Sequence, residues 1–395
     1  MKKITIVLGV MAIFLFVLPW NSLAANPRTV KVGFLVPITG IHPDWGKKQV
    51  VGLEMALEKV NAAGGVNGMP IQIVQYDTGS DPAQSASLLR KLAETDKVLA
   101  TIGPFYSVEC EVVFPLTTTL KVPVVGTASS KPGLSDLTKN PYAFRMTMTE
   151  DKMANAQFRR WISKYGVKTT AIIYDAKDAT ASIMGAKLWP PVFQGLGLKI
   201  LNEKDAITFN TGDVDFSAQV TKLKTYNPDG ICISALPQEA GRIVLEIRRQ
   251  GLKQPLISQN ESLAPAVVDI AGEAAEDFWS VGLFYVDDAN PKVQAYLKEF
   301  RSRCQKKYPG MSCDPEQFDV NVHDILHFLV DIMKKSGISN EPAKLQEDRE
   351  KIREGLVKLR DWHGTAGAMS FDEKGDGIRT VHILRVKNGK WQPVD

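Results

Sequence analysis

The chain has 395 residues, of which 44% are hydrophobic and 23% are charged, and its formal net charge is +4. This composition is typical of a globular protein and excludes a disordered chain. The small net charge excludes the strongly basic surface of a nucleic-acid-binding protein. After residue 25, no apolar run is long enough to span a bilayer.

Residues 1–25 have the pattern of a secretory signal peptide. Lys2 and Lys3 precede the stretch 4–18, which is apolar apart from Thr5, and small residues follow at 22–25. A membrane anchor is the alternative, but the apolar stretch is shorter than the ~20 residues of a spanning helix. No cysteine lies near the cleavage site, so a lipoprotein is excluded. We therefore expect a cleaved, exported protein in a periplasm.

The first half of the mature chain alternates short β-branched segments with amphipathic helical segments. Asp81 and Pro82 are an N-cap and first-turn pair for one of these helices. The expected strands are 30–36, 71–76, 98–102 and 122–125, and the expected helices include 46–61 and 108–120.

The same alternation starts again near residues 144–149. The expected strands are 171–174, 199–202, 230–234 and 255–257, with helices near 182–194, 216–225 and 239–249. The tail carries a strand near 278–282, helices at 291–307, 316–335 and 342–359, and a pair of hairpins from 367 to 393. Repeated strand–helix–strand units predict right-handed crossovers and parallel sheets. The fold class is therefore α/β, with two doubly wound lobes.

The four cysteines fall into two groups. Cys304 and Cys313 lie close in sequence on either side of a turn-forming stretch, and in an oxidising compartment we predict a disulfide between them. Cys110 and Cys232 lie in apolar segments and are interpreted as small buried hydrophobic residues.

Motifs for catalysis and cofactor binding are missing. The chain has no Gly-x-Ser-x-Gly, no phosphate-binding Gly-x-x-x-x-Gly-Lys, no Cys-x-x-Cys and no His-Glu-x-x-His. Asp319, His323 and His327 share one helical face and could bind a metal, although a solvent or lobe contact explains them as well. Residues 371–377 are acidic enough for calcium but include Lys374, which favours a polar turn. We expect no enzyme, no cofactor and no metal.

Several collinear segments resemble the leucine/isoleucine/valine-binding protein family, the periplasmic solute-binding proteins of branched-chain-amino-acid-type ABC transporters. The segments are 30–81, TIGPFYS at 101–107, 122–136, 212–224, 251–278 and MSFDEKGD at 369–376. The resemblance implies the type I periplasmic binding fold, in which three hinge crossings join two lobes. It places lobe one at 26–147 plus 283–379 and lobe two at 148–282 plus 380–395. The crossings fall near 146–149, 281–283 and 378–382.

The resemblance also implies which lobe-one residues bind ligand. In open α/β sheets, ligands bind where strand ends meet helix starts. Hydroxyl groups and free backbone N–H groups at such a helix start favour an anion, and N-capping serines are the structural alternative. The expected carboxylate site and aromatic wall comprise Phe105, Tyr106, Ser107, Ala128, Ser129, Ser130, Trp45, His42 and Phe318.

Lobe two departs from the family pattern. The family's acidic position, which binds an ammonium group, aligns with Asn260, with Glu261 one residue later. The family's aromatic positions align with Leu236 and Ala179. A buried ammonium without a carboxylate is costly. The sequence therefore favours an aromatic or aliphatic acid that lacks an α-amino group, and a branched-chain or other hydrophobic amino acid is the alternative.

We expect a monomeric binding protein that delivers its ligand to the permease subunits of an ABC importer in the inner membrane. A ligand sensor that docks on a membrane receptor is the alternative class. An enzyme would need an activated nucleophile or a metal, and only the stripe formed by Asp319, His323 and His327 on one helical face could supply one.

Overall fold

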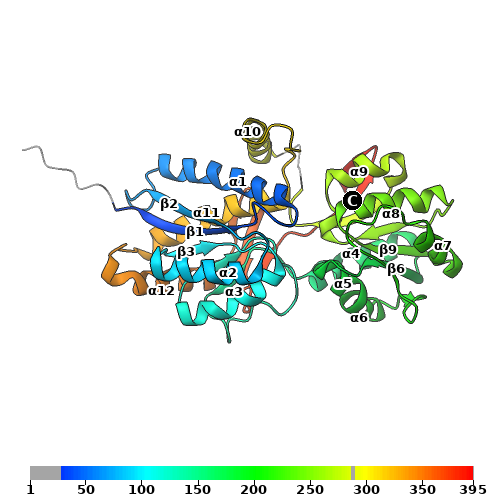
Figure 1. Cartoon of the computed structure of the whole chain (residues 1–395), viewed down its shortest axis with the longest axis horizontal. Coiled ribbons are helices and arrows are strands. Elements are labelled where there is room, and N and C mark those ends of the chain that lie inside the picture. The colour runs from blue at the N-terminus through cyan, green and yellow to red at the C-terminus, as the bar shows by residue number, and fades with distance from the viewer. Residues whose placement is uncertain (1–27, 286–289, 395) are drawn as a thin grey trace, which may run out of the picture.

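The computed structural model describes residues 28–285 and 290–394, so residues 1–25, interpreted as a signal peptide, lie outside the described part. Two separate sheets lie side by side along the long axis of the molecule (Figure 1). We call the elements around the five-stranded sheet lobe one and those around the eight-stranded sheet lobe two. Within the described ranges, no helix is both long and apolar enough to cross a membrane.

The sheet of lobe one is parallel throughout and has the order β2-β1-β3-β4-β5. Helices cover both of its faces, which is why β1 is almost continuously buried. Its strands are β1 (Val30–Val36), β2 (Ile71–Asp77), β3 (Ala100–Ile102), β4 (Val124–Gly126) and β5 (Ala143–Arg145). Its helices are α1 (Pro43–Ala62), α2 (Pro82–Arg90), α3 (Ser107–Leu120), α10 (Pro291–Lys307), α11 (Gln317–Ser336) and α12 (Leu345–Val357).

Apolar cores pack on both faces of the lobe-one sheet. Phe34 of β1 packs with α1, α11 and α12 in one core, and Leu35, one residue later, packs with α2 and α3 in the other. Successive strand residues point to opposite faces, so this alternation places α1 and α11 on one side of the sheet and α2 and α3 on the other. A small antiparallel sheet of β12 (Trp362–Gly364), β13 (Gly367–Phe371) and β14 (Gly377–Arg379) completes the lobe.

The sheet of lobe two has the order β16-β15-β11-β10-β9-β6-β7, and β8 also pairs with β6. Its strands are β6 (Thr169–Asp175), β7 (Lys199–Ile200), β8 (Ile207–Phe209), β9 (Gly230–Ser234), β10 (Leu256–Ser258), β11 (Phe278–Gly282), β15 (His382–Lys387) and β16 (Lys390–Pro393). Its helices are α4 (Glu150–Tyr165), α5 (Ala179–Ile183), α6 (Trp189–Gly195), α7 (Ser217–Tyr226), α8 (Pro237–Arg249) and α9 (Pro265–Ala271). Apolar residues of α7, α8 and α9 form the core on one face, and those of α4 and α6 form the core on the other.

Short turns of other helical types interrupt these elements. Two are π-helical, η1 (Lys91–Thr95) and η2 (Met184–Leu188), and three are 3₁₀, η3 (Asn260–Ser262), η4 (Gly272–Ala275) and η5 (Pro342–Lys344). The helix expected at 182–194 is present as α5, η2 and α6 in direct succession, with a π-helical turn in its middle that was not predicted.

The chain passes between the two sheets three times. The passages are the segment between β5 and α4, the connection from β11 towards α10, and the two residues between β14 and β15. Because β15 pairs antiparallel with β11, the last hairpin belongs to lobe two although its neighbour β14 belongs to lobe one. This topology is the α/β fold with two doubly wound lobes.

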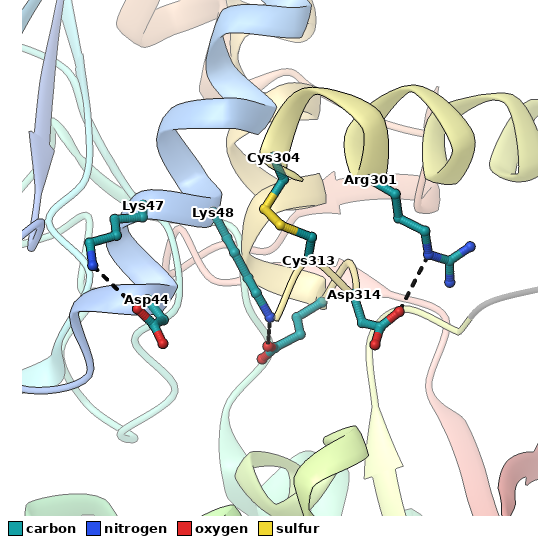
Figure 2. The surroundings of a disulfide bond; sticks show 8 residues. Asp44, Lys47, Lys48, Arg301, Cys304, Cys313 and Asp314 are labelled. Carbon is teal, nitrogen blue, oxygen red and sulfur yellow. Dashed lines mark hydrogen bonds and ion pairs between the residues drawn. A yellow bond between two sulfur atoms is a disulfide. The ribbon is translucent and has the colours of Figure 1, made fainter. Parts of the chain in front are cut away.

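A disulfide joins Cys304 in α10 to Cys313 in the loop before α11 (Figure 2). Ion pairs flank it, between Lys48 of α1 and Glu316 and, with 3.3 Å between Nε and Oδ1, between Arg301 and Asp314. The loop that leads into α11 is therefore held to α10 and α1. Cys110 and Cys232 are free and buried.

Candidate functional site

A cavity of about 410 Å³ lies between the lobes. It is lined by loops that follow β1, β3 and β4 of lobe one and β6, β8, β9 and β10 of lobe two. These loops leave the carboxyl ends of parallel strands, the place where open α/β sheets bind ligands. Its lining includes every residue expected at the ligand site except Ala179: His42, Trp45, Phe105, Tyr106, Ser107, Ala128, Ser129, Ser130, Leu236, Asn260, Glu261 and Phe318. The side chain of Ala179 lies outside the described part of the structure.

Two serines from different loops form the polar floor of the cavity. Ser107 begins α3, and its Oγ lies 3.2 Å from Oγ of Ser129, which follows β4. The carboxylate of Glu109 accepts a hydrogen bond of 2.8 Å from the Tyr106 amide and one of 2.9 Å from Ser85, which fixes the loop before α3. The first N–H groups of a helix have no intrahelical acceptor, so this corner offers both hydroxyl and amide donors to an anion.

Ser130 connects this floor to lobe two. Its carbonyl oxygen accepts a hydrogen bond of 3.1 Å from the amide of Glu150, the first residue of α4. Burial raises the pKa of the Glu150 carboxyl to about 7. The serine floor and the start of the first lobe-two helix are therefore in direct contact.

Aromatic rings form one wall. The Trp45 ring lies 4.6 Å from His42, 5.7 Å from Phe105 and 5.3 Å from Phe318, measured between ring centroids. Phe105 and Phe318 meet edge to face at 4.9 Å. The Tyr106 hydroxyl donates to the carbonyl oxygen of Ile41, which fixes the loop that carries His42. Such a wall favours a flat or apolar ligand body.

Lobe two contributes an apolar residue and several polar groups. Leu236 and Asn260 are each 3% exposed, and Glu261 Oε2 accepts a hydrogen bond of 2.7 Å from Gln259 Nε2. The Oδ1 atom of Asn260 is buried and has no hydrogen-bond partner among the described residues. The wall thus includes a hydrogen-bond acceptor, Asn260 Oδ1, that no donor in the described part of the protein satisfies.

Burial changes the titration of the groups around the cavity. Burial raises the pKa of Glu261 well above its usual range, and the neighbouring carboxylates of Asp178 and Glu150 raise it further. Burial also raises the pKa of Asp178. Burial lowers the pKa of His42, although the carboxylates of Glu239 and Asp178 act to raise it. The far wall therefore resists carrying several negative charges at once.

Sequence reasoning missed several lining residues. Lys177, Asp178 and Thr180 follow β6, and Thr211 follows β8. Asp178 is the N-cap of α5, and its Oδ1 accepts from the amides of Thr180 at 3.1 Å and Ala181 at 2.7 Å. The strand-end rule could have indicated Asp178, because it lies three residues after the end of β6, a largely buried strand.

A second cavity, of about 740 Å³, shares Asn260, Glu261 and Phe318 with the first. It lies between α9, the β15–β16 hairpin and the loop before α11. The interlobe space thus continues beyond the aromatic wall.

The stripe of Asp319, His323 and His327 makes structural contacts. Asp319 Oδ1 accepts a hydrogen bond of 2.7 Å from Tyr296, His323 Nδ1 lies 3.1 Å from Asp324 Oδ1, and His327 Nδ1 lies 2.8 Å from the His323 carbonyl oxygen. Within the described ranges, no group of three or more His, Cys, Asp and Glu residues is arranged to hold a metal ion. Asp372, in the acidic stretch 371–377, accepts hydrogen bonds from two turn amides, which is a polar turn.

Comparisons with known proteins agree with this geometry. The model of the periplasmic binding protein family matches residues 29–390. A Leu/Ile/Val-binding protein homolog of Brucella suis biovar 1 is 30% identical over 374 residues, which cover 92% of this chain and 90% of the relative.

Solved structures are similar over almost the whole chain. The branched-chain amino acid transporter substrate-binding protein LivJ from Streptococcus pneumoniae, in complex with isoleucine, has a TM-score of 0.76 and 26% identity and covers 92% of this chain and 98% of its own. A solute-binding protein of an ABC transporter from R. palustris, in complex with benzoate, has a TM-score of 0.75 over 93% of this chain and 95% of its own. At 19% identity, this last similarity shows the fold alone.

The family model spans both lobes, and the relative matches over nearly its full length. Both findings agree with the hinged two-lobe topology and the interlobe cavity. The chain therefore belongs to the periplasmic binding protein family, as a solute-binding protein of the ABC-transporter type and not an enzyme.

Proposed function

We propose that this protein captures a small organic carboxylate in the periplasm and delivers it to an ABC importer. We favour an aromatic or aliphatic acid without an α-amino group. The observation that carries this proposal is that one cavity combines a serine-lined helix start with a wall of aromatic rings. At the position where the family has an acidic residue for the ammonium, this chain has Asn260.

The ligand's carboxylate would bind to lobe one. Ser107, Ser129 and Ser130 supply hydroxyl groups, and the first amides of α3 supply N–H groups whose dipoles favour negative charge. Hydrogen bonds to a charged group are the stronger ones, so this corner would fix the ligand's orientation.

The ligand's body would pack between Trp45, Phe105 and Phe318 on lobe one and Leu236 on lobe two. Phe105 and Phe318 contact each other edge to face. The ring of an aromatic ligand can pack against the remaining faces and edges of these two rings. The size of the cavity, about 410 Å³, lies in the range of small-molecule sites.

A branched-chain or other hydrophobic amino acid is the second candidate. Glu261 stands one residue after Asn260 and lines the same cavity, so its carboxylate could pair with an ammonium. The relative from B. suis is a Leu/Ile/Val-binding protein homolog, which favours the same alternative. Against it, burial and two neighbouring carboxylates disfavour the ionised form of Glu261, the form that an ammonium requires.

Binding would be coupled to hinge closure. The ligand would first bind to lobe one, and rotation about the three connections between the sheets would then bury its body against lobe two. The closed form would dock on the permease subunits of the importer. In the alternative role of a sensor, the same closed form would dock on a membrane receptor.

Isothermal titration calorimetry of the purified mature protein tests the ligand class. We expect benzoate or a short aliphatic acid to bind and leucine, isoleucine and valine not to bind. Binding of the three amino acids without binding of any acid would establish the second candidate and end the first. Pull-down of detergent-solubilised permease by the liganded protein then separates importer delivery from a sensor role.

A matched pair of serine variants tests the site. Ser107→Ala should weaken binding of the acid by roughly 10-fold or more, because it removes a hydrogen bond to a charged group worth about 1.5–3 kcal/mol. Ser87→Ala, on the exposed surface of α2, is the control and should leave the affinity unchanged. Equal affinities of the two variants would place the carboxylate elsewhere.

A further inference from the structure

The far wall of the cavity contains hydrogen-bonding capacity that neither a plain aromatic ring nor an aliphatic chain would use. Asn260 is 3% exposed and lines the cavity, and its Oδ1 has no partner among the described residues. A buried polar group without a partner is costly, so most such groups in native proteins are satisfied. This unpaired acceptor therefore indicates that the ligand supplies the partner.

Asp178 presents a second unused acceptor to the same cavity. Its two hydrogen bonds, from the amides of Thr180 and Ala181, both use Oδ1. In the described part of the chain, no hydrogen bond to Oδ2 is formed. Oδ1 thus caps α5 and holds the side chain in place, and Asp178 lines the cavity with a second carboxylate oxygen that the cap does not use.

Both acceptors lie on the lobe opposite the proposed carboxylate site. Asp178 follows β6 and Asn260 follows β10 of lobe two, whereas Ser107 and Ser129 belong to lobe one. A ligand whose carboxylate binds to the serines would therefore present its other end to these two acceptors on closure. That end needs a hydrogen-bond donor.

We propose that the ligand is a hydroxylated aromatic acid, whose ring hydroxyl donates one hydrogen bond shared between Oδ1 of Asn260 and the carboxylate of Asp178. This inference rests on the proposed function and specifies its ligand class. It makes Asp178 a specificity-determining residue that acts on ligand rather than only a helix cap.

A hydroxyl group suits this wall better than an ammonium does. Burial raises the pKa of Asp178 and of Glu261, and the carboxylate of Asp178 further disfavours ionisation of Glu261. An ammonium needs a nearby ionised carboxylate, whereas a hydroxyl can hydrogen-bond with a carboxyl group in either protonation state. Asn260, being neutral, can likewise pair with a hydroxyl at no cost in charge.

Three ligands of the same shape provide the first test, by calorimetry on the mature protein. They are 4-hydroxybenzoate, 3-hydroxybenzoate and 4-methylbenzoate, in which a methyl group replaces the hydroxyl. We expect at least one hydroxylated acid to bind roughly 10-fold or more tightly than the methyl analogue, because a site that hydrogen-bonds a hydroxyl rejects the analogue without it. Equal or weaker binding of both hydroxylated acids would overturn the inference and leave the proposed function intact.

Variants provide the second test. Asp178→Ser keeps an N-capping side chain but is too short to contact the ligand's hydroxyl, so it should abolish the preference over 4-methylbenzoate while changing the affinity for 4-methylbenzoate by less than about 3-fold. Asn260→Ala should reduce the same preference and does not touch the α5 cap. Asp215→Ser is the control, since Asp215 accepts the Ser217 amide at 2.9 Å near the start of α7, outside the cavity.

The outcomes separate the two claims. A preference for the hydroxyl that survives in both Asp178→Ser and Asn260→Ala would overturn the inference. Binding of leucine with no binding of any benzoate would instead overturn the proposed function, and the inference with it.

Discussion

The side chains of Arg145 and Asp376 form an ion pair in which 2.6 Å separates Nε from Oδ1, and their exposures are 0% and 4%. Arg145 ends β5, just before the first passage between the lobes, and Asp376 lies just before β14, which leads to the third passage. On the lobe-two side, Lys152 of α4 contacts Asp372 at 2.8 Å. The pair therefore ties two of the three interlobe connections together at their base.

Removal of one partner of this pair should destabilise the protein strongly. Arg145→Met leaves the buried Asp376 with Lys152, 4.0 Å away, as its remaining cation within the described residues, and should lower the free energy of unfolding by about 3–5 kcal/mol. Urea denaturation followed by circular dichroism measures this. Lys222→Met, which breaks an exposed pair with Asp205, is the control and should cost less than about 1 kcal/mol. A similar cost for both variants would refute the role of the buried pair.

Glu150 should make stability fall as the pH rises towards neutrality. Burial raises its pKa from 4.5 to about 7, so between these values the folded state binds more protons than the unfolded state. The stabilisation is fully present below pH 4.5 and is lost as the pH rises through about 7, with a change on the order of 3 kcal/mol.

Glu150→Gln keeps the shape of the side chain and cannot ionise. In urea denaturation, the variant should match the wild type at about pH 4 and exceed its stability at about pH 8. Glu347→Gln, in the exposed first turn of α12, is the control and should leave the pH profile unchanged between about pH 6 and pH 8, because Lys351 lowers the pKa of Glu347. If Glu150→Gln leaves the profile unchanged as well, another group titrates in this range.

The disulfide should contribute stability in proportion to the loop that it closes. Cys304 and Cys313 lie 9 positions apart in the sequence, and cross-linking a loop of this length stabilises by about 2–3 kcal/mol in the chain-entropy model. The double variant Cys304→Ser/Cys313→Ser should melt at a lower temperature, and a reductant should lower the melting temperature of the wild type but not of the variant. A reductant effect of equal size on both proteins would assign the effect to another group.

Trp45 should contribute to ligand affinity through its ring rather than through its volume alone. Trp45→Leu removes the contacts with Phe105 and Phe318 and should weaken binding of an aromatic acid by roughly 3- to 10-fold, since an aromatic pair adds about 0.5–1.5 kcal/mol. Calorimetry with benzoate measures this change. Trp362→Leu, which changes a tryptophan of β12 away from the cavity, should leave the affinity unchanged; a loss of affinity in both variants would indicate a general effect on folding.

Much of the fold could be predicted from local patterns. Helix α10 has the predicted bounds because Asn290 caps it, Pro291 occupies its first position and apolar residues recur at helical spacing. Helix α1 begins three residues before the predicted Gly46, at Pro43, directly after His42 with φ of 46°. Such boundary shifts depend on backbone geometry that a periodicity does not encode.

The helix at 179–195 contains a π-helical turn that local patterns do not predict. Its apolar spacing is helical throughout, but Pro190 and Pro191 have no N–H groups to donate to the preceding turn. The structure accommodates them with the π-helical turn at Met184–Leu188, whose bond runs from the Trp189 amide to the Met184 carbonyl oxygen. Strand β8 escaped prediction because a three-residue strand is too short to display a period.

The site was predictable in part, for a physical reason. Ser107 and Ser130 follow apolar strands, so the strand-end rule and the family resemblance both indicate them. Thr211 could not be found in this way, since it reaches the cavity only because β8 pairs with β6. Contacts between residues that are far apart in the sequence depend on the order of the strands in the sheet, which local patterns do not predict.

The pairing of β15 with β11 has a practical consequence for anyone who shortens this protein. A truncated chain that ends after β14 would retain all of lobe one, yet it would expose the backbone N–H and C=O groups of β11 along a newly created sheet edge. Unprotected edges recruit other chains, so such a fragment should aggregate through its remaining lobe-two strands. The final hairpin thus covers the edge of β11 and prevents the eight-stranded sheet from pairing with other chains along that strand.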